Sequence, residues 1–226
     1  MSDVAIIGGT GNQGYGLALR WALAGKSVVI GSRQAERAEE AAGNLRAAVA
    51  AAGKQALAII GLENGAAAAD APVVVVAVPL AAQIATIKSI KEQIRPDVVL
   101  IDVTVPLATA LGGRASRILG LPAGSAAEQL AEYAPAGVQV VSAFHFLSAD
   151  LLADPEQNLD CDVVVCGGDA RAQGIVRELA EAIAGVRYVH AGALPAARLV
   201  EAAAAMLISI NIRHKVRHSG MRITGV

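Results

Sequence analysis

The chain has 226 residues, of which 54% are apolar, 17% are charged and 3% are aromatic, and its formal net charge is -1. This length suits one large α/β domain, or a nucleotide-binding domain with a small second lobe, and the core must be filled mainly by aliphatic side chains. Lysine and arginine are scattered rather than gathered into a basic stripe, which argues against nucleic acid as a partner.

No targeting or membrane segment is predicted. The first residues run straight into the apolar segment 4–9 without a basic leader. The longest Ala-rich stretch, 191–212, is broken by Pro195 and carries Arg198 and Glu201. We therefore expect a soluble, cytoplasmic protein with no membrane span.

Short runs rich in Val and Ile recur along the chain, and helical stretches separate them. The runs are apolar throughout rather than alternating, which indicates strands that are buried on both faces. We expect strands over residues 3–8, 27–31, 56–60, 72–78, 97–102, 138–143, 162–167 and 187–192. Helices that each end at a glycine are expected over 14–25, 34–52 and 170–185. This order predicts a doubly wound, mostly parallel sheet.

The first strand leads into a glycine-rich turn that opens the first helix. Gly9, Gly11 and Gly14 have the spacing of the Rossmann dinucleotide fingerprint, in the strand-turn-helix context that gives the motif its meaning. Gly9 permits a tight turn, Gly11 lets the backbone approach a pyrophosphate, and Gly14 lets helix and strand pack closely. The polar residues of the turn can add donors: Thr10, Asn12 and Gln13.

The end of the second strand predicts which dinucleotide is bound. An NAD site usually has a carboxylate there, on the ribose hydroxyls. This strand ends in Ser32 and Arg33, and Arg37 lies one helical turn further on. Two guanidinium groups and a hydroxyl can converge on a 2′-phosphate, which favours NADP over NAD.

The strand at 72–78 ends in Val78, followed by Pro79, at the edge of the sheet where doubly wound proteins place ligands. These two residues can line the ribose on the nicotinamide side of a bound dinucleotide. A proline that simply ends the strand explains the same pattern.

Regularity drops after residue 102. The segment 103–125 is rich in Pro, Gly and small residues, which is typical of a long loop beside a site. The stretch from about Ala193 to Ile212 predicts one long helix, followed by a basic tail over 213–226. Because this helix has many small residues, we expect it to pack against its copy in a homodimer.

No catalytic or metal-binding constellation is recognisable, and we expect none. Cys161 and Cys166 bound one predicted strand and are expected to be buried structural thiols. His145 follows a predicted strand and is a candidate contact to a second ligand, although a structural role is the more common one for a lone histidine. We expect Arg198 to pair with Glu201 on the same helix.

Several segments, in order, resemble the NADPH-dependent coenzyme F420 reductase family: 8–14, 30–33, 142–145, 161–169 and 194–201. The likeness covers nearly the whole chain. The resemblance implies reversible hydride transfer between C5 of the deazaflavin coenzyme F420 and C4 of the nicotinamide of NADP(H). It also implies a Rossmann domain over 1–145 and a smaller, helical C-terminal lobe over 146–226 that completes the second-substrate site.

The resemblance carries roles to individual positions. His145 and Arg198 are implied to lie beside the deazaflavin. Contacts to NADP are implied for Thr10 to Gln13, Ser32, Arg33, Arg37, Val78 and Ala149.

Two other functions remain open at this point. Ala202 and Ala204 replace a Ser and a Thr of the family, and the loop at 103–125 differs from it. These departures leave room for an NADPH-dependent flavin or ferric reductase. A non-catalytic NADP(H) sensor is the third alternative, and it would need no open pocket at the nicotinamide.

Overall fold

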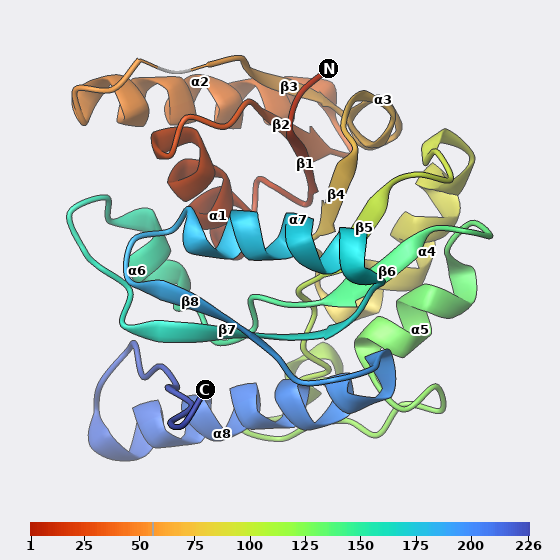
Figure 1. Ribbon diagram of the computed structural model, residues 1–226, viewed down its shortest axis with the longest axis vertical. Coiled ribbons are helices and arrows are strands. Elements are labelled where there is room, and N and C mark those ends of the chain that lie inside the picture. Colours follow the sequence, from red (N-terminus) through yellow and green to blue (C-terminus); the bar gives the residue numbers. More distant parts are fainter. Residues whose placement is uncertain (56) are drawn as a thin grey trace.

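The computed structural model describes residues 1–55 and 57–226, and they form one eight-stranded sheet with helices on both faces (Figure 1). The strand order is β3-β2-β1-β4-β5-β6-β7-β8. Neighbouring strands are parallel except for β6 and β7, which are antiparallel. The predicted doubly wound, mostly parallel sheet is confirmed.

The strands are β1 (Val4–Ile7), β2 (Val28–Ser32), β3 (Ile59–Glu63), β4 (Val73–Val76), β5 (Val99–Asp102), β6 (Gln139–Ser142), β7 (Cys161–Gly167) and β8 (Val186–His190). The α-helices are α1 (Asn12–Leu23), α2 (Ala35–Ala51), α3 (Asn64–Asp70), α4 (Leu80–Ile90), α5 (Ala126–Tyr133), α6 (Ala149–Ala153), α7 (Ala170–Glu181) and α8 (Ala197–His214).

Alternate residues of each central strand feed two separate cores. Val4 and Ile6 of β1 pack in the core shared with α1, α2, α7 and α8, whereas Ala5 and Ile7 pack in the core shared with α3, α4 and α5. A strand that has a core on each side cannot alternate apolar with polar residues. This explains the uninterrupted apolar runs in the sequence.

The chain builds the sheet outward in two directions from β1. It runs from β1 through β2 to β3, then returns to the other side of β1 with β4 and continues through β5 and β6. The strand order therefore reverses between β1 and β4. In doubly wound sheets, ligands bind outside the carboxyl ends of the strands at this point.

The C-terminal part of the chain continues the sheet. The expected boundary at 145/146 falls between β6 and β7, where the strand direction reverses. Beyond it, β7 and β8 extend the same sheet, and α8 packs against β7 and α5. The fully buried Trp21 links the two parts, since its indole Nε1 donates to the backbone carbonyl of Leu179, 2.8 Å away.

The long C-terminal helix is present, with a different start. The predicted helix over 193–212 begins as a 3-10 turn, Leu194–Ala196, at Pro195, and then becomes α8. In the described part of the chain, Leu194–His214 is the one segment long and apolar enough to cross a membrane by length and composition. One side of α8 is in the core, where Glu201 is 1% exposed.

Two local expectations need adjustment. The strand expected over 56–60 is β3 at Ile59–Glu63, and Ala56 lies outside the described residues. Because β3 begins three residues later than expected, Gly61 falls within it and packs against α2. A Cβ atom on Gly61 would lie 2.2 Å from the carbonyl carbon of Ala38. The expected loop at 103–125 contains only a 3-10 turn, Ala108–Leu111, and an isolated bridge between Leu107 and Ile118.

Candidate functional site

A cavity of about 900 Å³ lies at the carboxyl edge of the sheet, where the strand order reverses. We call it the first cavity. The sequence-predicted residues that line it are Thr10, Gly11, Ser32, Arg33, Arg37, Val78 and Pro79. The segments that the sequence marked for NADP thus converge from β1, β2 and β4 on one hollow.

The glycine-rich turn is shaped for an anion. Gly8 has φ +83°, and a Cβ on Gly14 would lie 2.8 Å from the carbonyl oxygen of Gly8. The nearest atom to a Cβ on Gly11 would be 3.4 Å away, so this face of the turn is open. Gly11 is the N-cap of α1, and no side chain caps that helix. Free N–H groups therefore face the cavity, as a pyrophosphate requires.

Two arginine side chains line the part of the first cavity that lies at the end of β2. Arg33 and Arg37 are exposed, and in the part of the chain that the structure describes no carboxylate lies within ion-pair distance of either. The Ser32 hydroxyl accepts a long bond from the Gln34 N–H, at 3.4 Å. This set suits a phosphate monoester, which offers three acceptor oxygens and a charge near -2.

Two residues of the first cavity were missed by sequence reasoning. Asn64 is buried, lines the cavity, and its Oδ1 has no hydrogen-bond partner among the described residues. Glu63 lies beside Ser32 in the register of β2 and β3, and its Oε2 accepts from the Gly65 N–H at 2.8 Å. A buried acceptor without a donor fits a ribose hydroxyl. Their position at the carboxyl end of β3 was the available signal.

A second cavity of about 320 Å³ lies on the other side of the glycine-rich turn. Gln13 lines it, and its Nε2 donates to the carbonyl oxygen of Phe144 at 3.3 Å. His145 and Ala149 also line it, together with Ala204. The resemblance implied a contact of Ala149 with NADP, and the structure places this residue beside His145 in the second cavity.

His145 is held in position by its strained neighbour. Phe144 has φ +67°, which is rare for a bulky residue, and its buried ring meets Trp21 edge to face with centroids 5.5 Å apart. Both ring nitrogens of His145 are buried without a partner among the described residues. Burial lowers the pKa of His145 to about 4, so the imidazole is neutral near pH 7.

Two carboxyl groups lie buried beneath the sheet edge. Asp102 Oδ1 accepts from Thr104 Oγ1 at 2.7 Å and from Gln83 Nε2 at 3.1 Å, whereas Oδ2 has no partner in the described chain. Burial raises the pKa of Asp102 to about 7 and that of Glu201 to about 8. Both groups therefore keep a proton to a higher pH than an exposed acid does.

Arg198 and Glu201 do not form the expected pair. The Glu201 carboxylate instead accepts from the N–H groups of Ala126 and Ala127, at 2.9 and 3.1 Å, and so caps α5. Arg198 is exposed and is not among the residues lining the two cavities. Residues three apart on a helix point about 60° apart, so Glu201 faces the core whereas Arg198, at the edge of that face, lies in solvent.

The remaining sequence expectations concern the turn and the thiols. Asn12 is exposed at the start of α1, and Gly9 and Gly14 are buried against the first strand. Cys161 and Cys166 are free and buried, as predicted, and burial raises the pKa of the Cys166 thiol to about 11. Among the described residues no group of His, Cys, Asp and Glu could hold a metal ion.

Comparison with known proteins adds an independent finding. Residues 3–106 match the family model described as NADP oxidoreductase, coenzyme F420-dependent. An F420-dependent NADP reductase of Methanothermobacter thermautotrophicus is 46% identical over 224 residues, which cover 99% of this chain and 95% of that protein. The enzyme of the same description from Methanocaldococcus jannaschii is 42% identical over 223 residues, covering 99% and 98%.

A solved structure shares the whole fold. It is described as a candidate F420-dependent NADP reductase from an Arthrobacter species, and it superposes with a TM-score of 0.80. The alignment covers 99% of this chain and 100% of that one, at 23% identity.

Proposed function

This chain belongs to the F420-dependent NADP reductase family, and from that premise we propose that it transfers a hydride reversibly between NADP(H) and coenzyme F420. The observation that carries the proposal is the pair of cavities on either side of one glycine-rich turn. One has the donors for a dinucleotide phosphate, and the other has a neutral imidazole and a mostly apolar wall.

The first cavity would hold NADP. The N-terminus of α1, with Gly11, would receive the pyrophosphate, and Arg33 and Arg37 with Ser32 would receive the 2′-phosphate. Asn64 would accept from a ribose hydroxyl. Val78 and Pro79, at the end of β4, would place the nicotinamide-side ribose towards the second cavity.

The second cavity would hold the deazaflavin. A hydride passes between the two bound rings, so the protein needs to align them and exclude water more than to supply acid or base. Gln13, fixed on the Phe144 carbonyl, would present its side chain to the second cavity, and the ring of the neutral His145 would form part of the wall against the deazaflavin. No described residue is required to form a covalent bond with substrate.

We further propose a cytoplasmic homodimer built on α8. Its outer face exposes Leu199 (68%), Met206 (49%) and Ile210 (37%), which lie on one side of the helix. Alanines between them leave room for close packing. A second copy of the same face would cover this stripe. Within each copy, residues 1–145 would bind NADP and residues 146–226 would complete the second-substrate site. These two parts differ in role although their strands belong to one sheet.

The test is an acceptor panel. Purified protein is mixed with NADPH, and its oxidation is followed with oxidised coenzyme F420, FMN, FAD, ferric citrate and no acceptor. We expect turnover with F420 at least 100-fold above the other acceptors. Preference for a flavin or ferric iron would establish the alternative that the apolar Ala204 in the second cavity favours. Tight NADPH binding without turnover on any acceptor would indicate a sensor.

A further inference from the structure

A dense run of positive charge follows the exposed end of α8. Residues 213–218 read Arg-His-Lys-Val-Arg-His, so that five of the six side chains are basic in a chain whose net charge is -1. We call these residues the basic segment. Every one of them is exposed.

The basic segment turns back towards the sheet. Lys215 has φ +53°, a left-handed conformation that ends α8. The Val216 N–H donates to the carbonyl oxygen of Asn211, and the Ser219 N–H donates to Asn211 Oδ1 at 2.9 Å. The last residues consequently fold back beside α8 (Figure 1).

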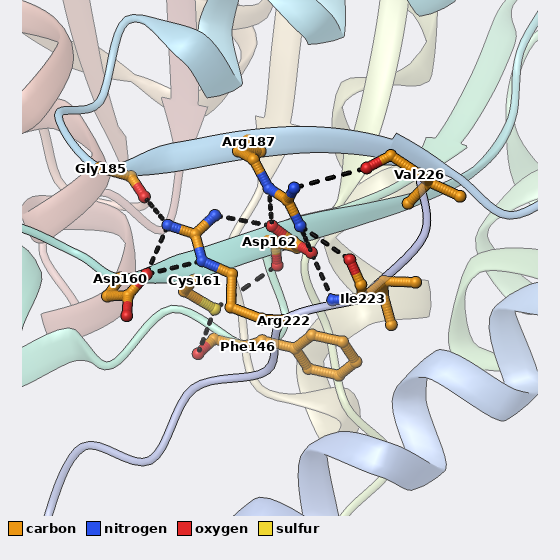
Figure 2. Close-up of polar contacts among 9 residues, drawn as sticks. All are labelled: Phe146, Asp160, Cys161, Asp162, Gly185, Arg187, Arg222, Ile223 and Val226. Carbon is orange, nitrogen blue, oxygen red and sulfur yellow. Dashed lines mark hydrogen bonds and ion pairs between the residues drawn. The ribbon is translucent and has the colours of Figure 1, made fainter.

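A cluster of ion pairs fixes the far end of this turn. Figure 2 shows that Arg187 of β8 and Arg222, near the C-terminal end of the chain, both form ion pairs with the fully buried carboxylate of Asp162. Arg187 makes two bonds of 2.8 Å, and Arg222 Nη1 makes one of 2.7 Å. The Ile223 N–H donates to the same carboxylate at 2.7 Å. We call these four residues the Asp162 clamp.

Held at both ends, the basic segment forms part of the wall of the second cavity. Arg217 and Ser219 line that cavity together with His145 and Gln13. The Ser148 hydroxyl lies 3.5 Å from the Arg217 carbonyl oxygen. Asp150 is the one acid among the lining residues. Arg217 therefore brings a cation of the basic segment to the hollow proposed for the deazaflavin, and Lys215 and Arg213 precede it along the exposed chain.

Helix stabilisation accounts for only some of these charges. Arg213 and His214 are in the last turn of α8, where cations favour the helix dipole. Arg217 and His218 lie beyond the left-handed residue and have no such role. Across the described chain, no carboxylate lies within ion-pair distance of Arg213, Lys215 or Arg217, in contrast to Arg187 and Arg222.

We propose that the basic segment binds the anionic side chain of the second substrate, namely the phosphodiester and glutamate carboxylates that extend from the deazaflavin ring. The inference rests on the proposed function. The ring enters the second cavity, and its side chain leaves past Arg217 and along Lys215 and Arg213. The basic segment selects the complete coenzyme over the bare deazaflavin nucleoside and does not act on hydride transfer.

The test removes the charge and keeps the fold. The variant R213Q/K215Q/R217Q is compared with K26Q/K54Q/K91Q, which loses the same charge. These three lysines precede β2, β3 and β5, and so lie at the amino edge of the sheet, away from both cavities. KM and kcat are measured with NADPH and three acceptors: F420 with two glutamates, F420 with five or more, and the deazaflavin nucleoside without phosphate or glutamate. Each is measured at low and high salt.

We expect the KM of the first variant for F420 to rise about tenfold, which is the effect of two or three exposed ion pairs. Its KM for the nucleoside and for NADPH, its kcat and its melting temperature should be unchanged. The salt dependence of the F420 KM should shrink, because fewer charges are screened. The control variant should behave as the parent chain does.

Three results would overturn the inference. An equal rise in KM for the nucleoside would mean that the effect is on the ring. An unchanged KM for F420, with loss of binding to phosphatidylserine vesicles, would assign the basic segment to an anionic membrane surface. If the parent chain turns over the nucleoside but F420 no better, the side chain is not recognised, whereas no turnover on either deazaflavin contradicts the proposed function itself.

Discussion

Arg33 and Arg37 extend into the first cavity from the end of β2 and from the first turn of α2. We expect R33A/R37A to raise the KM for NADPH about 100-fold, since each hydrogen bond to a charged group contributes roughly 1.5–3 kcal/mol. The KM for NADH should change less than about threefold, because NADH has no 2′-phosphate. Steady-state kinetics with both dinucleotides measure this.

Arg46 supplies the matched control for the arginine pair. It is also on α2 but bonds Glu39 and the carbonyl oxygen of Ile59, outside the cavity. R46A should leave the preference for NADPH over NADH as it is. An unchanged preference in R33A/R37A would show that the 2′-phosphate binds elsewhere.

Asp102 and Glu201 make the free energy of unfolding depend on pH. Their pKa values rise from 3.8 and 4.5 to about 7 and 8, so the folded chain holds protons that the unfolded chain releases. The stabilisation is complete below pH ~4 and is lost as the pH rises towards ~8. Protonation of His145, whose pKa is lowered, acts in the opposite direction, and only below pH ~6.5.

D102N isolates one of these groups, because the amide is neutral at every pH and retains the Oδ1 acceptor. Between pH 5 and 7 we expect the parent chain to lose about 2 kcal/mol more of its free energy of unfolding than D102N loses. Urea titrations at both pH values provide the comparison. D97N, at an exposed acid just before β5, is the control. Parallel losses in the parent chain and D102N would mean that Asp102 is ionised throughout.

Single residues differ in how far the sequence reveals them. The glycines and arginines of the first cavity were recognisable because each depends on its own short motif. Asn64 was not, since its role comes from a hollow formed by segments from β1, β2 and β4. The same holds for Glu201, whose partners on α5 are 74 and 75 residues away in the chain.

At the scale of elements, α8 has two apolar sides and only one of them is buried. If the outer side joins two copies, L199E/M206E should convert the dimer to a monomer, because four carboxylates would be buried without partners. Light scattering coupled to gel filtration gives the mass. I212E is the control, since Ile212 is exposed on the other side of the same helix. A monomeric parent chain would contradict the dimer directly.

The elements themselves were largely predictable, and their ends less so. Each expected strand is present because a strand buried on both faces leaves an unbroken apolar run. The shift of β3 to Ile59–Glu63 was hidden, because it depends on the contact of Gly61 with α2 rather than on local sequence. The helices α3, α4 and α6 were not predicted, and their Ala-rich sequences give little periodic signal.

At the scale of the whole molecule, the class of fold followed from the alternation of strands and helices, but the direction of β7 did not. A strand that is buried on both faces looks the same in sequence whether it is parallel or antiparallel. The Asp162 clamp was equally invisible, because Arg187 and Arg222 are 25 and 60 residues from Asp162. Reversal at β7 brings the end of the chain back to the second cavity.

The position of Trp21 gives the molecule an optical reporter. The sequence has one tryptophan, and its ring is fully buried against Phe144. The carbonyl oxygen of Phe144 accepts a hydrogen bond from Gln13, which lines the second cavity. All indole fluorescence of the protein therefore originates at this single point. Emission from it overlaps the absorption of reduced nicotinamide and of oxidised deazaflavin, so energy transfer to either ligand can be followed without a label.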